Sequence, residues 1–238
     1  GCFAAGNNRL SRELIVRKGI DSLEDLRGKS FGVQSIGGGA WLSTNVSLDA
    51  LGIDVDKYKL NMRVIGDTGT QTQAHLTGNI DAAMLPYSYA EIAKRGGAKS
   101  LADVGALKVV YQATVMCALK DSNPATFETH MALAKGLIES LIYILEPANR
   151  RDVAGILRRN LRLAKEEEGE SSARTAQLQM PNVEIGLNVE SWKTVRRIVT
   201  RINPKVQEVD LDQVIVSSVI QNLETSGFLP EMRKKVPR

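Results

Sequence analysis

The sequence predicts an α/β fold, on two observations. Between residues 21 and 107, strand-like apolar runs alternate with helix-like runs through short loops that contain glycine or proline. Strands that alternate with helices form mainly parallel sheets, which helices cover on both faces. After residue 119, apolar residues recur almost entirely at helical spacing. We therefore expect two α/β lobes, of which one is complete, and a helical C-terminal region.

The first strand and helix unit begins with a short helix. Residues 22–25 resemble a capping box, and Gly28 can end that helix in a left-handed conformation. The run SFGVQS over residues 30–35 predicts a strand that leads into a glycine loop. Apolar residues at helical spacing predict an amphipathic helix over residues 40–51, and Gly52 ends it.

Two further units follow the same order. Residues 58–64 alternate between apolar and polar, which is typical of a strand buried on one face. The loop GDTGTQ, residues 66–71, then leads into a short helix. In the third unit, a strand over residues 80–85 reaches Pro86 and is followed by a helix over residues 87–95.

The remaining elements are two strands, of which the first is a short one near residues 14–16, and several helices. We expect a long strand over residues 108–119 and a helix that starts near Pro124. A solvated linker, KEEEGESS, is expected over residues 165–172. The helix from Pro124 carries the apolar residues between 133 and 144 and is broken by Pro147. A basic helix with apolar residues between 153 and 161 follows, and further helices are expected over residues 188–202 and 217–226.

These elements divide the chain into three expected parts. They are a complete α/β lobe over residues 20–107, a discontinuous and partial α/β lobe from residues 1–19 and 108–164, and a helical C-terminal region over residues 165–238 that packs on the discontinuous lobe. The discontinuous lobe has few strands for its helices to cover. An apolar face around Leu133 to Ile144 must therefore be covered by a homodimer partner or by the region after Lys165.

Composition excludes several classes of protein. With 43% hydrophobic and 24% charged residues among 238, the chain is neither disordered nor fibrous. The longest apolar stretch, residues 136–145, is far shorter than the roughly 20 residues that span a bilayer. The net charge of +4 suits anionic partners, but the basic residues are scattered and only 5% of residues are aromatic. We therefore expect no nucleic-acid partner.

The sequence offers no catalytic or metal-binding pattern. The chain contains no GxSxG, HExxH or CxxC motif, and His75 and His130 fall on different expected helices. Cys2 and Cys117 are too few for a disulfide framework or a four-cysteine zinc site, and they leave the redox compartment open. We expect no enzyme activity, no metal and no organic cofactor.

The glycine and proline loops are the candidate ligand site. Each follows a strand, and open α/β sheets bind ligands at the carboxyl ends of their strands. Exposed backbone N–H groups at the start of a helix suit an anion or a polar group. The alternative is that the glycines only allow a tight turn, and that Trp41 only covers the sheet edge. The expected ligand-binding residues are Ser35, Gly37, Gly38, Gly39, Trp41, Thr70, Gln71, Pro86, Tyr87 and Ser88.

Three segments together resemble a known family. They are GIDSLEDLRGKSFGVQSIGGGAWLSTNVSLDALGID, LTGNIDAAMLPYSYAEIAKRGG and VIQNLETSGFL. They are similar to the substrate-binding proteins of ABC importers for nitrate, sulfonates, bicarbonate and thiamine-precursor pyrimidines. The resemblance implies a type II periplasmic-binding-protein fold, in which two α/β lobes close on a small ligand. Since the units that open the first lobe of such proteins are absent from this sequence, that lobe is expected to be incomplete at its N-terminus.

The resemblance implies an extracytoplasmic solute receptor. Such a protein binds a small polar or anionic organic molecule and delivers it to an ABC permease, in the periplasm or outside the cell, and some are anchored as lipoproteins. This sequence shows no export signal. One alternative is an enzyme similar to pyrimidine-precursor synthases, which depend on histidines and a cysteine-rich segment. The other is the ligand-sensing domain of a regulator, which needs a helix-turn-helix.

Overall fold

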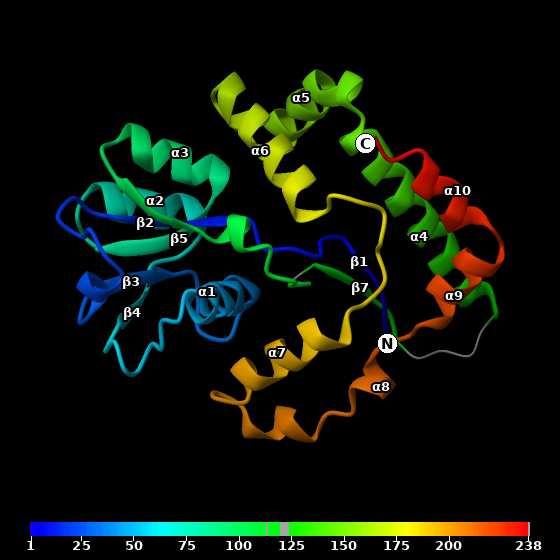
Figure 1. Ribbon diagram of the computed structural model, residues 1–238, viewed down its shortest axis with the longest axis horizontal. Coiled ribbons are helices and arrows are strands. Elements are labelled where there is room, and N and C mark those ends of the chain that lie inside the picture. The colour runs from blue at the N-terminus through cyan, green and yellow to red at the C-terminus, as the bar shows by residue number, and fades with distance from the viewer. Residues whose placement is uncertain (113, 120–123, 238) are drawn as a thin grey trace. The chain divides into compact units, whose positions relative to one another are not determined.

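The computed structural model describes residues 1–112, 114–119 and 124–237 (Figure 1). Two compact units are present, and each contains segments distant in the sequence. The sheet unit consists of Leu10–Val109 and Thr194–Gln207, and the helical unit consists of Gly1–Arg9, Val110–Lys193 and Glu208–Arg238.

The sheet unit is built on a five-stranded sheet with the strand order β4-β3-β5-β2-β6. The strands are β2 (Arg12–Val16), β3 (Ser30–Val33), β4 (Asn61–Val64), β5 (Ala82–Pro86) and β6 (Lys99–Asp103). β3 pairs in parallel with β4 and β5, whereas β2 lies between β5 and β6 and is antiparallel to both. Four strands therefore run in one direction and β2 alone is reversed, which agrees with the mainly parallel sheet that the sequence predicts.

The strand β2 corrects one expectation. We expected residues 14–16 in the discontinuous lobe, but they are central in the sheet of the sheet unit. Leu14, Ile15 and Val16 are fully buried there. Their continuous apolar run fits a strand that is covered on both faces of its sheet. β6, over Lys99–Asp103, was not predicted at all, because its sequence KSLAD has little strand character.

Helices cover both faces of this sheet. α2 (Thr68–Leu76) and α3 (Tyr87–Arg95) pack on one face, and α1 (Gly39–Ala50) lies on the other (Figure 1). Small residues let the helices approach closely, since Ala74, Ala90 and Ala93 pack against Ile15 and Leu85. Two short 3-10 helices also belong to this unit: η1 (Glu24–Leu26) and η2 (Val104–Leu107).

The helical unit contains a small sheet and several helices. β1 (Cys2–Ala5) and β7 (Val115–Cys117) pair antiparallel, and a disulfide joins Cys2 to Cys117. Within the described part of residues 108–119, only β7 is a strand, so the long strand expected there is wrong. The helices are α4 (Pro124–Leu145), α5 (Arg150–Asn160), α6 (Glu166–Gln179), α8 (Leu211–Val214), α9 (Ser218–Thr225) and α10 (Phe228–Lys234), with the 3-10 turn η3 (Pro147–Asn149).

The chain changes from the helical unit to the sheet unit within α7 (Val189–Val199), and it returns to the helical unit within the 3-10 helix η4 (Pro204–Glu208).

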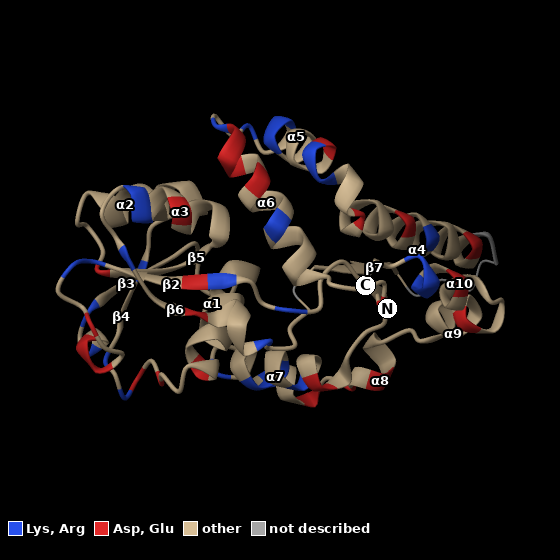
Figure 2. Ribbon diagram, turned by 45° about the horizontal axis from the view of Figure 1, so that its top comes forward, with Lys and Arg blue, Asp and Glu red and all other residues tan. Residues whose placement is uncertain are grey.

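α6 begins where a solvated linker was expected. Its first turn carries Glu166, Glu167 and Glu168, and negative charge stabilises the start of a helix (Figure 2). The Glu168 carboxylate also accepts hydrogen bonds from the backbone N–H groups of Ala164 and Lys165. The acidic run is therefore a helix start, and the linker expectation is wrong.

The apolar face of α4 is covered by its own chain. Ile138 and Leu141 lie in a core with Phe3 of β1, Leu223 of α9 and Leu229 of α10. Of the two alternatives expected from the sequence, a homodimer partner or the region after Lys165, the second is the one observed. A homodimer is not needed for this face and stays a prediction, as does the incomplete first lobe.

Among the helices of the described residues, none is long and apolar enough to span a membrane.

Candidate functional site

The candidate loops meet at one edge of the sheet. In the parallel registers, Val33 of β3 pairs with Val64 of β4, and Gly32 of β3 pairs with Ala83 of β5. The three strands therefore end on the same side. The segments that follow them, residues 34–38, residues 65–67 and the start of α3, form what we call the loop edge.

The loop after β3 presents the start of α1. Gly37 has a φ of 82°, in the left-handed region that favours glycine. Gly38 is the N-cap of α1, where no side chain caps the helix. A Cβ on Gly38 would lie 2.5 Å from Ser35 Oγ, so a side chain there would displace Ser35. The first N–H groups of α1 from Gly39 onward lack intrahelical acceptors, as at every helix start.

Trp41 lies in the first turn of α1 and is only 8% exposed. Its backbone carbonyl accepts a hydrogen bond from Asn45 Nδ2. Burial of the indole favours the interpretation in which Trp41 packs on the protein, while its backbone N–H belongs to the uncapped turn.

The loop after β4 uses its own side chains for its structure. Asp67 Oδ1 caps α2 by accepting hydrogen bonds from Thr70 N at 2.8 Å and from Thr70 Oγ1 at 2.9 Å. These two bonds, backbone first, hold the pKa of Asp67 below its ordinary value. Gln71 is buried, and its Nε2 donates to Gly66 O at 2.9 Å. Thr70 and Gln71 therefore stabilise the loop in this structure.

The third segment joins β5 directly to α3. Pro86 is the last residue of β5 and the N-cap of α3. The Tyr87 hydroxyl donates to Asp103 Oδ1, which also accepts from Gly105 N. Ser88 is buried within the first turn of α3. All ten expected residues thus belong to the sheet unit, at or beside its loop edge.

The start of β2 lies at the same edge, although no residue there was predicted as part of the site. Arg12 pairs in register with Pro86, and its Nη1 donates to Met84 O at 3.3 Å. Ser11, immediately before β2, is 1% exposed and its hydroxyl has no hydrogen-bond partner among the described residues. The antiparallel insertion of β2 brings these donors to the loop edge, and no local pattern in the sequence indicates that insertion.

Glu13, the next residue, is buried and paired with a lysine of α3. Lys94 Nζ lies 3.1 Å from Glu13 Oε1 and 2.6 Å from Glu91 Oε1. Burial alone would lower the pKa of Lys94, but its hydrogen bonds to Glu91 and Glu13 raise that pKa above the ordinary value. This ion pair neutralises the acid beside Arg12, which leaves the loop edge suited to an anionic or polar ligand.

The helical unit holds a polar cavity of about 220 Å³ that the sequence did not indicate. Gln112 and Asn188 line it. The Gln112 side chain accepts from Asn188 N at 2.6 Å and donates to Gly186 O at 2.8 Å. Asn188 Oδ1 caps α7 by accepting from Ser191 N.

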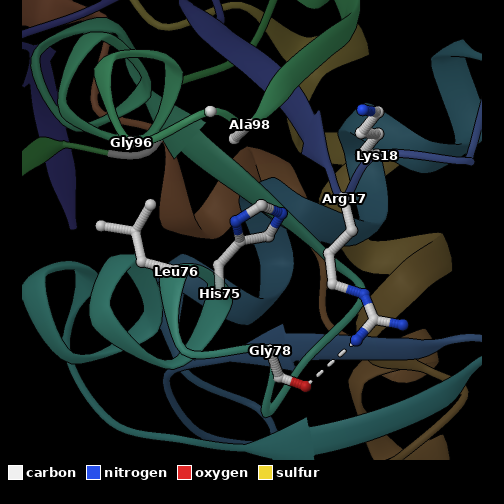
Figure 3. A pocket seen from close by; sticks show the side chains of 8 residues that line it. Arg17, Lys18, His75, Leu76, Gly78, Gly96 and Ala98 are labelled. Carbon is white, nitrogen blue, oxygen red and sulfur yellow. Dashed lines mark hydrogen bonds between the residues drawn. The ribbon is translucent and has the colours of Figure 1, made fainter.

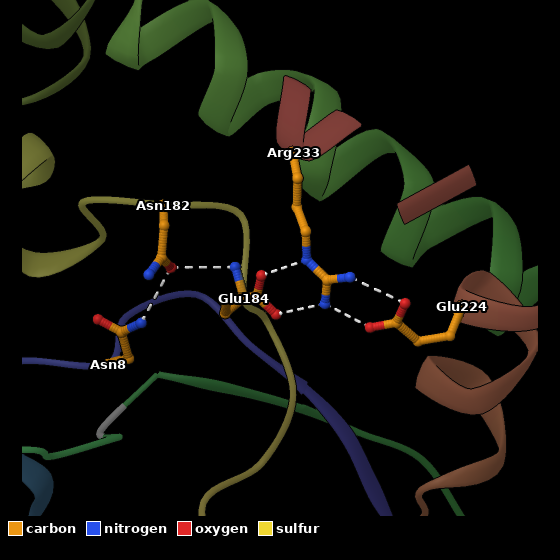
Figure 4. A network of polar contacts seen from close by, with 5 residues as sticks. All are labelled: Asn8, Asn182, Glu184, Glu224 and Arg233. Atoms are coloured by element: carbon orange, nitrogen blue, oxygen red, sulfur yellow. Dashed lines mark hydrogen bonds and ion pairs between the residues drawn. The ribbon is translucent and has the colours of Figure 1, made fainter. Parts of the chain in front are cut away.

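A network of polar contacts holds the loop that carries this cavity. Arg233 of α10 contacts the carboxylates of Glu184 and Glu224, and these contacts raise its pKa (Figure 4). Asn182 Oδ1 accepts from Glu184 N at 3.0 Å and from Asn8 Nδ2 at 3.4 Å. The loop is thereby tied to both α10 and the segment before the sheet unit.

No known protein family matches the sequence, and no similar curated protein is found. Solved structures do match in fold. The sulfonate-binding protein SsuA of Methylobacillus flagellatus, described as a putative sulfonate ABC transporter component, has a TM-score of 0.65 at 14% identity, over 95% of this chain and 69% of that one. The periplasmic aliphatic sulphonate-binding protein SsuA of Escherichia coli has a TM-score of 0.63 at 17% identity, over 90% and 69%.

An enzyme shares the same fold. The desulfurization enzyme DSZB has a TM-score of 0.62 at 15% identity, over 94% of this chain and 79% of that one. At these identities the similarity establishes the fold alone. The chain therefore has the α/β fold of the periplasmic binding proteins.

Proposed function

We propose that the protein is an extracytoplasmic solute receptor, which binds a small polar or anionic organic molecule and delivers it to an ABC permease. The observation that carries this proposal is the loop edge, where three strand ends and the uncapped start of α1 converge. The fold is one that SsuA-type receptors use. Binding without chemistry needs only such donors, aimed at a ligand from rigid elements.

The donors at this edge favour an anionic group. The uncapped N–H groups at Gly39 and beyond carry the positive end of the α1 dipole, and Arg12 adds a guanidinium at the neighbouring strand. We propose as ligand-binding residues Ser35, Gly37, Gly38, Gly39, Trp41, Thr70, Gln71, Pro86, Tyr87 and Ser88, and we add Arg12. Thr70 and Gln71 contribute by fixing the shape of the loop after β4.

The disulfide supports a location outside the cytoplasm. Disulfides persist in oxidising compartments such as the periplasm and are rare in the cytosol. Cys2 and Cys117 form one here, and the two neighbours named SsuA are described as periplasmic proteins. Since the Cys2 thiol is in the disulfide, it is not free to carry a lipid in this form of the protein.

The alternative function is that of an enzyme, because DSZB has the same fold. One of its structures is a cysteine-to-serine mutant in complex with biphenyl-2-sulfinic acid. In this chain both cysteines form the disulfide, so neither offers a thiolate nucleophile. His75 and His130 lie in different units. These features support the receptor over the enzyme.

A thermal-shift assay tests the site. The wild-type protein is heated with members of a panel of small anions: alkanesulfonates, nitrate, bicarbonate and carboxylates. Gly38→Val places a side chain against Ser35 and narrows the approach to the α1 N–H groups, so it should abolish any ligand-induced rise in Tm. Gly136→Ala, on α4 with no atom within 4 Å of its added Cβ, is the matched control and should keep the rise. An equal rise in Gly38→Val would contradict the proposed site.

A further inference from the structure

The opposite edge of the sheet, where the parallel strands begin, holds a cavity of about 310 Å³ within the sheet unit (Figure 3). Val16, the end of β2, pairs with Ala82 at the start of β5, which places the residues after β2 at this edge. The wall contains Arg17 and Lys18, His75 from the last turn of α2, and the backbone after α3 at residues 96–98.

His75 is the unexplained group of this cavity. The side chain is 3% exposed, and neither ring nitrogen makes a hydrogen bond of normal geometry within the described residues. Figure 3 shows the imidazole between the backbone near Gly96 and the side chain of Arg17. A buried imidazole normally has a partner for each nitrogen, because a buried polar atom without one is unfavourable.

The basic residues around His75 differ in whether a carboxylate pairs with them. Arg17 Nη2 lies 2.5 Å from Asp81 Oδ1, and its Nη1 donates to Gly78 O at 3.3 Å, so two of its five N–H groups are used. Lys18 is exposed and has no ion pair among the described residues. On α3, the charged residues of the last turn are Lys94, held by Glu13 and Glu91, and Arg95.

Burial, followed by the charge of Arg17, lowers the pKa of His75, while the Asp81 carboxylate and backbone act in the opposite direction. The imidazole is therefore neutral near pH 7, with one donor and one acceptor nitrogen. An anion in the cavity would favour its protonation and turn both nitrogens into donors.

We propose that this cavity is a second binding site, which takes a small oxyanion held by His75 and Lys18. The anion accepts a hydrogen bond from the His75 ring and pairs with the Lys18 ammonium and the remaining N–H groups of Arg17. Among the described residues, no group of three or more His, Cys, Asp or Glu is placed to hold a metal ion, and the cationic wall disfavours one. The site is independent of the proposed solute site, because it lies at the opposite edge of the sheet.

Histidine NMR tests the proposal directly, since the chain contains only two histidines. The full chain with isotope-labelled histidine is titrated at constant ionic strength with inorganic phosphate, sulfate and acetate in separate experiments. The His75 ring signals should shift saturably, and its pKa should rise when the anion is present. His130, which stacks on Phe3 in the helical unit, is the internal control and should not respond. The three anions distinguish tetrahedral oxyanions from a carboxylate.

Three variants make the test specific. Lys18→Ala should weaken the response of His75 about tenfold, as expected for a lost charged hydrogen bond. Lys57→Ala removes another exposed lysine of the same unit and should leave the response unchanged. Gly38→Val, which alters the loop edge, should also leave it unchanged. The proposal is overturned if no anion shifts His75, if Lys18→Ala responds like the wild type, or if Gly38→Val abolishes the response.

Discussion

Cys2 and Cys117 face each other in register on β1 and β7, and their disulfide spans 115 residues of the sequence. Residues 10–109 of the sheet unit lie between the two cysteines. The disulfide therefore ties together the two segments of the helical unit that flank this insertion. In a chain-entropy account, closing so long a loop removes much of the freedom of the unfolded chain.

We predict that loss of this disulfide lowers stability. The double variant Cys2→Ala, Cys117→Ala should lose about 4 kcal/mol of unfolding free energy, because its unfolded state is no longer cross-linked. Urea denaturation of the variant and the wild type measures the difference. The same treatment after reduction of the wild type should give a similar loss. Equal midpoints for oxidised and reduced protein would contradict this role.

We predict that Asp81 makes the stability of the sheet unit sensitive to acid. Burial raises its pKa, but hydrogen bonds from Ser30 and the nearby Arg17 outweigh burial and lower that pKa below 3.8. A carboxylate with a lowered pKa stabilises the fold above its unfolded pKa, and this contribution is lost as the pH falls through the folded pKa. Stability should therefore fall as the pH drops below about 4.

Asp81→Asn should flatten this part of the pH dependence and cost about 1–3 kcal/mol at neutral pH. Asp56→Asn removes an exposed carboxylate of the same unit and serves as the control. The measurement is the urea midpoint between pH 3 and pH 7. An unchanged pH profile in Asp81→Asn would show that Asp81 does not carry the effect.

We predict that His75 causes a second loss of stability, which begins at a higher pH than that of Asp81. Its pKa is lowered from 6.5 because the ring is buried, so the unfolded chain binds the proton more tightly than the folded one. This contribution is complete above pH 6.5 and is lost as the pH falls toward the folded pKa. His75→Gln should remove the loss of stability that begins as the pH falls below about 6.5, measured in a chloride buffer free of oxyanions. The step should persist in His130→Gln, and its presence in both variants would contradict the assignment.

We predict that substitutions along α4 lower the stability of the helical unit by different amounts, according to the burial of each side chain. Ile138 is fully buried among residues of β1, α9 and α10, whereas Leu133 is 50% exposed. Ile138→Ala should cost about 2–5 kcal/mol, and Leu133→Ala should cost less than about 0.5 kcal/mol. Thermal unfolding at two protein concentrations checks both values. A larger effect at Leu133, dependent on concentration, would indicate a partner chain on that face.

The sequence predicted the elements that local chemistry determines. The strand before Gly37, the helix after it, and the turn at Pro86 follow from apolar spacing, from glycine and from proline, and the structure has all three. The parallel direction of the strands that end at the loop edge follows from the alternation of strands and helices.

The features that were missed depend on distant segments. Nothing near Arg12 indicates that β2 inserts between β5 and β6 and brings its start to the loop edge. The pairing of Cys2 with Cys117 likewise needs the register of β1 and β7. The acidic run at residues 165–172 is the exception, because its cause is local: the charged residues are typical of a solvated linker, although acidic residues also favour the first turn of a helix.

The proposal that this protein is a solute receptor is tested most directly by native mass spectrometry of the purified chain after incubation with the anion panel. We predict one small polar or anionic molecule bound per wild-type chain, released unchanged on unfolding, and absent from Gly38→Val. A wild-type chain that binds none of the panel and carries no co-purified molecule, or one that releases a chemically altered product, would contradict the receptor function.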